Sequence, residues 1–298
     1  MLKIIIPLVL ASASALATSA CPEVRGAVSD VIFTGEVNCS LAGDFSERLN
    51  DMQKIFGGPS LALIVVAASG NASYDEGHSM IVPIRPVFQG EYGQEYPVPV
   101  ANVVTYASHE FGHAVLHEKI KKEFAKKFSV IFAEMDHVSD LNEQLNRGKS
   151  DGKAYNEAFI QLMSSADYQF FTEHFLPYSE FFADVLAVYI ENDRSAIMNS
   201  LYYDQMKNEE YNALRLRDFA YVTDHSIDHL MDEAHTKLAY VRSYVGKNLW
   251  PKNDSEKRQY ADKIYKAIVK VVKENMEKKE VPDVAEANKQ LIDELKKP

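Results

Sequence analysis

Two histidines four positions apart constrain the fold of this chain more than any other feature. They are His109 and His113 of "HEFGH" (109 to 113). Four residues of an α-helix rise about 6 Å and return to nearly the same face, so both imidazoles point the same way. Two such rings can converge on one metal ion at about 2.1 Å each. The spacing therefore predicts a helix through "YASHEFGHAVLHE" (106 to 118) with a metal-binding face.

The residue after the first histidine indicates what such a metal would do. Glu110 lies one position round the helix, where its carboxylate can reach a water on the ion without binding the ion itself. A glutamate has no structural reason to stand there, so it favours catalysis. His117 continues the stripe, but eight residues place it about 12 Å from His109, too far to share the ion. We expect His117 behind the site or on the surface.

A catalytic zinc ion needs a third protein ligand and leaves the fourth position to water. In metzincins the third ligand is a histidine six residues after the second histidine, with a glycine between them. That arrangement is absent here, because Leu116 stands at the glycine position and Lys119 at the histidine position. A closed structural zinc site is disfavoured because no cysteine lies near. A later segment must supply the ligand.

The segment "LPYSEFFADVLAVYIEND" (176 to 193) is the best source of that ligand. It is predicted to be a helix that begins near Pro177, with Ser179 as a possible cap. Glu180 and Asp184 fall one turn apart on one face. In isolation they would more often be solvated carboxylates, but after "HEFGH" they predict a ligand and a carboxylate that orients a liganding histidine.

The pairing of "HEFGH" with a later "SEFFAD" resembles the gluzincin group of zinc metallopeptidases. The resemblance implies one Zn²⁺ per chain, held by His109, His113 and Glu180. It implies that Glu110 is the general base and acid, and that Asp184 steadies a histidine ligand. It also implies hydrolysis of a peptide or protein substrate, as an endopeptidase, and a fold whose N-terminal mixed sheet has an edge strand over the cleft.

The order of elements read from the residues is α+β. "VIFTGEV" (31 to 37) and "LALIVVAA" (61 to 68) read as strands, separated by a helix that Gly57 and Gly58 end. A polar loop, "GNASYDEGHS" (70 to 79), precedes "MIVPIRPVF" (80 to 88). Pro83 and Pro86 cannot donate ladder hydrogen bonds, so this last strand is predicted at the sheet edge, where an extended peptide could pair with it.

From Ala101 onward the pattern is mainly helical, with breaks predicted near 148 to 152, Pro177, 192 to 193, Pro251 and Pro282. The expected organisation is a leader (1 to 20), a zinc metallopeptidase-like domain (21 to 250, with a sheet part to 100 and a helical part from 101) and a C-terminal helical extension (251 to 298). The role of the long stretch between His113 and Glu180 stays open.

The first twenty residues have the layout of a secretory signal: Lys3, an apolar run, and small residues before cleavage after Ala17 or Ala20. A secreted or cell-envelope location is expected. In an oxidising compartment Cys21 and Cys39 predict a disulfide. The alternative is a lipoprotein box, "TSAC", in which Cys21 is lipidated, although Thr18 stands where such boxes usually have Leu.

The net charge of −11 argues against a nucleic-acid partner, since phosphate binding needs clustered Lys and Arg. No apolar run of about 18 residues follows the leader, so no membrane-spanning helix is expected in the mature chain. The sequence does not indicate an oligomeric state.

The oxyanion that forms in the reaction needs a further hydrogen-bond donor. The resemblance to gluzincins implies that a histidine, tyrosine or arginine from a later helical segment supplies it. In "TDHSIDHLMDEAHTKLAYVRSYVG" (223 to 246) the first choice is His235, with Asp232 on the same helical face, and Arg242 lies two turns further. Other donors and their possible orienting carboxylates are His225, His229, Tyr240, Tyr244, Asp224 and Asp228. A histidine-rich helix with only a structural role is the alternative.

Two readings from other classes stay open. The chain could be a catalytically inactive zinc-fold scaffold or binding protein of the envelope, because intact motif residues do not prove an open cleft. Alternatively, "HEFGH" could be a coincidence in a helical interaction domain, which requires both motifs to be accidents in the right order.

Overall fold

The computed structural model describes residues 21, 24, 26–85, 99–201, 213–222 and 229–298. The α+β class is confirmed: the described strands precede residue 84, with one helix between the first two, and the described elements from Val100 onward are helices. Four strands in this described part form one mixed sheet in the order β1-β2-β4-β3, with β1, β2 and β4 parallel and β3 antiparallel to β4. Their bounds are β1 Val31–Phe33, β2 Leu63–Ala67, β3 Ser73–Tyr74 and β4 Ser79–Pro83. The predicted signal (1 to 20) lies outside the described residues.

The prediction of an edge strand at 80 to 88 is wrong, because β4 lies inside the sheet between β2 and β3. The edge strands are β1 and β3, and the sequence indicated the residues of β3 as loop. Pro83 is tolerated because Ile84 donates to the Ala67 carbonyl, so the nitrogen of Pro83 faces the side of β3. The pairing of β3 with β4 ends at Ile81, so no residue of β3 needs a hydrogen bond from the nitrogen of Pro83. Pro86 lies outside the described residues.

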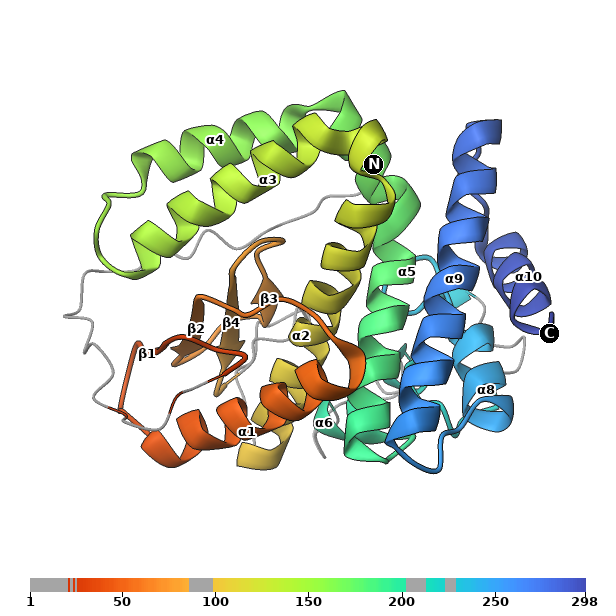
Figure 1. The fold of residues 1–298 in the computed structure, drawn as a ribbon, viewed down its shortest axis with the longest axis horizontal. Coiled ribbons are helices and arrows are strands. Elements are labelled where there is room, and N and C mark those ends of the chain that lie inside the picture. The colour runs from red at the N-terminus through yellow and green to blue at the C-terminus, as the bar shows by residue number, and fades with distance from the viewer. Residues whose placement is uncertain (1–20, 22–23, 25, 86–98, 202–212, 223–228) are drawn as a thin grey trace.

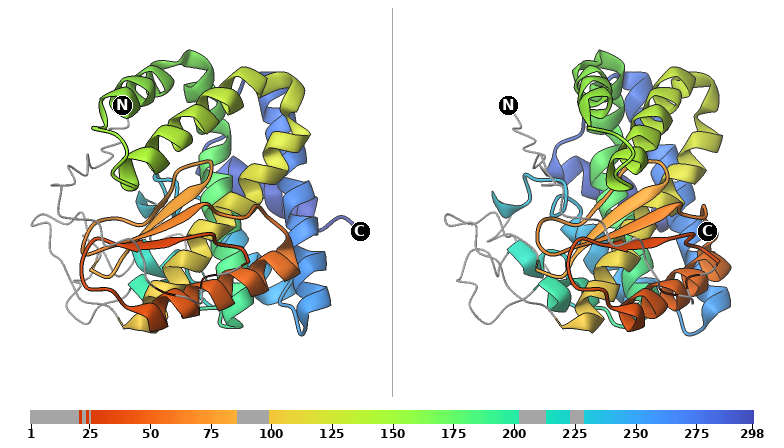
Figure 2. Two further views of the ribbon diagram at one scale, coloured as in Figure 1. Left: turned by 60° about the vertical axis from the view of Figure 1, so that its left-hand side comes forward. Right: turned by 90° about the vertical axis from the view of Figure 1, so that its left-hand side faces the viewer.

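Helices α2 and α5 run side by side through the middle of the molecule, with the sheet on one side and α8 to α10 on the other (Figure 1). Helices α3 and α4 form a hairpin on the side of the molecule that holds the sheet, as both views of Figure 2 also show. The helix bounds are α1 Cys39–Phe56, α2 Val100–Glu123, α3 Ala125–Asn146, α4 Lys153–Ser164, α5 Ala166–Glu191, α6 Ala196–Leu201, α8 Ala239–Asn248, α9 Asp254–Lys278 and α10 Val284–Leu295.

Helix α5 starts earlier than predicted, and Pro177 does not break it. Its N-cap is Ser165, whose side chain accepts from the Tyr168 amide, so Ser179 is an interior residue and no cap. A proline at 177 leaves the carbonyl of Glu173 without its helical donor. Glu173 is exposed, so water can satisfy that carbonyl.

One hydrophobic cluster runs from Cys21 to Leu295. The segment from 251 belongs to it, because α9 packs against α5 and α1 and contributes apolar residues such as Ile264 and Ile268. The described helices include none that is both long and apolar enough to span a bilayer.

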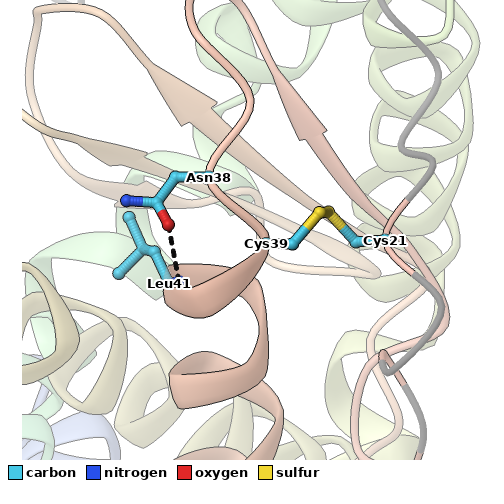
Figure 3. The surroundings of a disulfide bond; sticks show 4 residues. All are labelled: Cys21, Asn38, Cys39 and Leu41. Carbon is cyan, nitrogen blue, oxygen red and sulfur yellow. Dashed lines mark hydrogen bonds between the residues drawn. A yellow bond between two sulfur atoms is a disulfide. The ribbon is translucent and has the colours of Figure 1, made fainter.

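The N-terminal end of this core is held by a disulfide between Cys21 and Cys39, which confirms that prediction (Figure 3). Cys39 opens α1, where the Asn38 side chain caps the helix by accepting from the Leu41 amide. The Sγ of Cys21 is therefore engaged, and a thioether-linked lipid on the same atom is incompatible with this bond.

Candidate metal centre and its cavity

Gly112 lets the two motif helices touch. A Cβ at this position would lie 2.6 Å from the Cα of Ala183 on α5, a distance at which no side chain fits. Because the backbones meet here, residues one turn away on each helix face one another across a short gap. The glycine inside "HEFGH" therefore has a packing reason, and it brings the histidines of α2 to the carboxylate of α5.

The structure brings His109, His113 and Glu180 together as a group that could hold a metal ion, with one ligand atom from each within 4.8 Å of the others. The Nε2 atoms of the two histidines are 3.1 Å apart. The Nε2 of His109 lies 3.4 Å from Glu180 Oε2, and the Nε2 of His113 lies 3.7 Å from Glu180 Oε1. Two imidazole nitrogens and one carboxylate are a donor set that zinc accepts.

The other ring nitrogen of each histidine has a partner that orients it. His109 Nδ1 lies 2.9 Å from Oδ1 of Asp184, and His113 Nδ1 lies 2.8 Å from Oγ of Ser179. With both Nδ1–H groups donating outward, each Nε2 is directed at Glu180. Asp184 thus lies where it can hold the ring of His109.

Asp184 is itself fixed by two buried arginines. Arg217 donates to it at 2.6 and 3.1 Å, and Arg242 donates at 2.9 Å, while the Asp184 side chain is fully buried. Burial raises the pKa of this carboxyl, but the guanidinium groups outweigh burial and hold the pKa well below its usual range. The carboxylate is therefore ionised and available to His109 at any moderate pH.

The ligand atoms of this group hold a proton that a metal ion would replace. Burial lowers the pKa of His109, but Asp184 and Glu180 outweigh burial and raise it to about 9, whereas burial lowers the pKa of His113 to about 4. Because His109 has the higher pKa, the proton lies on His109, whose Nε2 is 3.1 Å from the Nε2 of His113. A metal ion would replace that proton and bind Glu180 Oε2, which is buried and has only ion-pair contacts with His109 and His235, so these residues fit zinc.

Glu110 lies beside this group and is 6 % exposed. Burial raises the pKa of its carboxyl to about 7, with the nearby Glu180 charge adding to the rise and His109 opposing it. A carboxyl poised near neutral pH can both take and return a proton, which is the property a general base and acid needs.

The three ligand candidates and Glu110 open onto a cavity of about 230 Å³. Its walls come from one face of α2, one face of α5, the β3 edge with the following turn, and His235. The lining residues are Ala72, Ser73, Tyr74, Glu76, His109, Glu110, His113, His117, Ile120, Phe171, Thr172, Phe175, Leu176, Ser179, Glu180 and His235.

His235 reaches this cavity, but not in the way predicted. Its Nε2 lies 3.3 Å from Glu180 Oε2 and its side chain is 47 % exposed. The orienting carboxylate is Glu233, 2.7 Å from Nδ1, and not Asp232, because residues 232 to 238 form bends and turns in place of a helix. Glu180 raises the pKa of His235 further than burial lowers it. The alternative donor His225 and the possible orienting carboxylates Asp224 and Asp228 lie outside the described residues.

Arg242 does not reach the cavity, which corrects its predicted role as a donor to substrate. It is fully buried behind Asp184, and its guanidinium lies over the Phe181 ring. His229, another candidate, is exposed and is not among the lining residues of the cavity.

His117 is outside the group of ligand candidates, as predicted, and it lines the cavity instead of lying on the surface. It is half-buried between the rings of Tyr74 and Phe132 and lines the cavity two turns beyond His109. Its distance along the helix still keeps it from the metal group.

Sequence reasoning missed Ser179 and Arg217. Ser179 could have been found, since it precedes Glu180 and faces α2 once the helix is extended past Pro177. Arg217 carries no sequence signal: it stands 33 residues after Asp184 in an ordinary stretch, and only the tertiary fold brings them together.

No protein-family model matches this chain, and neither a curated protein nor a solved structure is significantly similar to it. The interpretation of the site therefore depends on its own geometry.

Proposed function

We propose that this protein is a zinc-dependent peptidase of the gluzincin type. The observation that carries the proposal is the convergence of His109, His113 and Glu180 beside a buried Glu110 with a near-neutral pKa, on a cavity with a strand edge. A metal-binding scaffold would need the three ligands but not Glu110. The disulfide supports an oxidising, extracytoplasmic location.

A zinc ion held by these ligands would supply an acidified water and polarise the scissile carbonyl. Glu110 would accept a proton on its carboxylate as the water attacks, and the same carboxyl would then return a proton to the leaving amine. Its raised pKa suits both transfers, because neither protonation state is strongly preferred near pH 7.

His235 is the group best placed to donate to the developing oxyanion. Its Nε2 contacts the same oxygen of Glu180 as His109 does, and Glu233 fixes its orientation through Nδ1. The charge of Glu180 favours its protonated form, which makes it a cationic donor. The edge of β3 lines the same cavity, so Ser73 and Tyr74 offer backbone groups to an extended peptide.

The test is hydrolysis of a mixed quenched-peptide library by zinc-loaded protein, with Glu110→Gln and His235→Ala beside the wild type. Glu110→Gln should retain its zinc and lose about 10²- to 10⁴-fold in kcat/KM. His235→Ala should lower kcat by about 10²-fold while KM changes little. Full activity in Glu110→Gln would contradict the mechanism, and a zinc-loaded but inactive wild type would favour the scaffold.

A further inference from the structure

The far end of the cavity holds a carboxylate that the proposed reaction does not use. From His109 the cavity follows α2 through His117 to Ile120, about 16 Å of helix. The facing wall on α5 is apolar there, with Phe171 and Phe175. Glu76, from the turn after β3, lines this end and contacts Tyr168, about three turns before Glu180 on α5.

Among the residues that the structure describes, none is a cationic partner of Glu76. Its carboxylate accepts one hydrogen bond, from the hydroxyl of Tyr168 at 3.1 Å, and no Lys or Arg in the described part of the chain forms an ion pair with it. The neighbouring His117 supplies no charge, since burial lowers its pKa to about 4, and its Nε2 is buried without a partner. Burial raises the pKa of Glu76 to about 7, as expected of a carboxylate facing apolar walls.

The turn does not need this side chain. Asp75 closes the turn by accepting from the amides of Gly77, His78 and Ser79, and Asn142 of α3 donates to its other oxygen. Glu76 itself has a φ of 60°, a left-handed conformation that glycine or asparagine would adopt more readily. A strained, desolvated glutamate at the end of a cavity is a candidate for ligand recognition.

We propose that Glu76 binds a cationic group of the peptide substrate, either a Lys or Arg side chain or a free N-terminal amine, at the far end of this cavity. The inference rests on the proposed peptidase function. The apolar walls formed by Phe171, Phe175 and Ile120 suit the methylene stem of a basic side chain, with the charge at Glu76. An ion pair at Glu76 also satisfies the carboxylate that burial otherwise penalises.

The experiment compares peptides that differ only in one residue, Lys or norleucine, with both termini blocked, and a third set with norleucine and a free N-terminus. Wild type should cleave one cationic set with a kcat/KM at least about tenfold higher than that for the blocked norleucine set. In Glu76→Gln this ratio of kcat/KM values should fall to within about twofold. Which set is favoured identifies the source of the cation. Asp140→Asn is the matched control, since this exposed carboxylate lies on α3 outside the cavity, and its ratio should match that of wild type.

A binding readout separates this inference from the proposed reaction. Anisotropy of the same labelled peptides on zinc-loaded Glu110→Gln, with and without Glu76→Gln, measures the cation preference without turnover. A Glu76-dependent preference in binding supports the site even if wild type hydrolyses nothing. Equal affinity for all three sets, or a preference that survives Glu76→Gln, overturns it.

Discussion

The contact at Gly112 gives the sharpest prediction about how the fold builds the site. In Gly112→Ala the new methyl would lie 2.6 Å from the Cα of Ala183 and 3.1 Å from its Cβ and carbonyl oxygen. Carbon atoms in contact prefer about 3.5 to 4.0 Å, so α2 and α5 must separate by about 1 Å. Overpacking of this kind costs about 1 to 3 kcal/mol, against a helix-propensity gain of about 0.5 to 1 kcal/mol.

The separation should also loosen the metal group. Glu180 is three residues from Ala183 on the same helix, so it moves with α5 away from His109 and His113. Metal sites tolerate ligand displacements of only about 0.2 Å, so we expect zinc affinity to fall by about tenfold or more. The assays are urea unfolding with chelator present, for the packing cost, and competition with a zinc-binding dye, for the affinity.

Gly43 provides the matched control. It lies inside α1, and a Cβ there would meet nothing within 4 Å. Gly43→Ala should therefore stabilise the protein by about 0.5 to 1 kcal/mol and leave zinc affinity unchanged. If Gly112→Ala is as stable as Gly43→Ala and binds zinc like wild type, the close helix contact is not what positions the ligands.

Three further predictions follow from buried charge and covalent constraint. Asp184→Asn leaves two buried arginines without their carboxylate, so the unfolding free energy should fall by about 3 to 5 kcal/mol and zinc affinity by about 10- to 100-fold. A fall in unfolding free energy of less than about 1 kcal/mol would contradict the account. The pKa of Glu76 is raised from 4.5 to about 7 in the folded protein, so the unfolded chain ionises first as the pH rises. The stability of wild type relative to Glu76→Gln should therefore fall by about 3 kcal/mol between pH 4.5 and pH 7 and then stay level. Urea titrations at a series of pH values measure this difference, and a flat profile would refute the burial of the charge. Replacing Cys21 and Cys39 by serine opens a disulfide with a sequence separation of 18 and should lower the thermal midpoint by an amount equivalent to about 3 kcal/mol, and an unchanged midpoint would count against this constraint.

Local spacing predicted much of the site. The four-residue steps from His109 to His113 and from Glu180 to Asp184 fix faces of helices, and the helical rise is the same in any fold. The class followed from the change of period after residue 100. The disulfide followed from two cysteines in a short segment with no competing partner.

Tertiary contacts decided what spacing could not. Arg217 and Arg242 meet at Asp184 only because the chain after α6 returns to the back of α5, which no local pattern encodes. Pro83 predicts an edge strand, but a proline can lie beside a strand as short as β3 once the pairing has ended. Pro177 predicts a helix start, but an exposed residue one turn earlier, whose carbonyl water can reach, makes an interior proline tolerable.

The most direct test of the central claim is the zinc content of purified mature protein, measured by elemental analysis for wild type, Glu180→Ala and Glu110→Gln, with peptide hydrolysis on the same samples. The account predicts one zinc per chain in wild type, a sharp loss in Glu180→Ala, and full zinc without activity in Glu110→Gln. A wild type that binds no zinc, or zinc content that ignores Glu180, would contradict it.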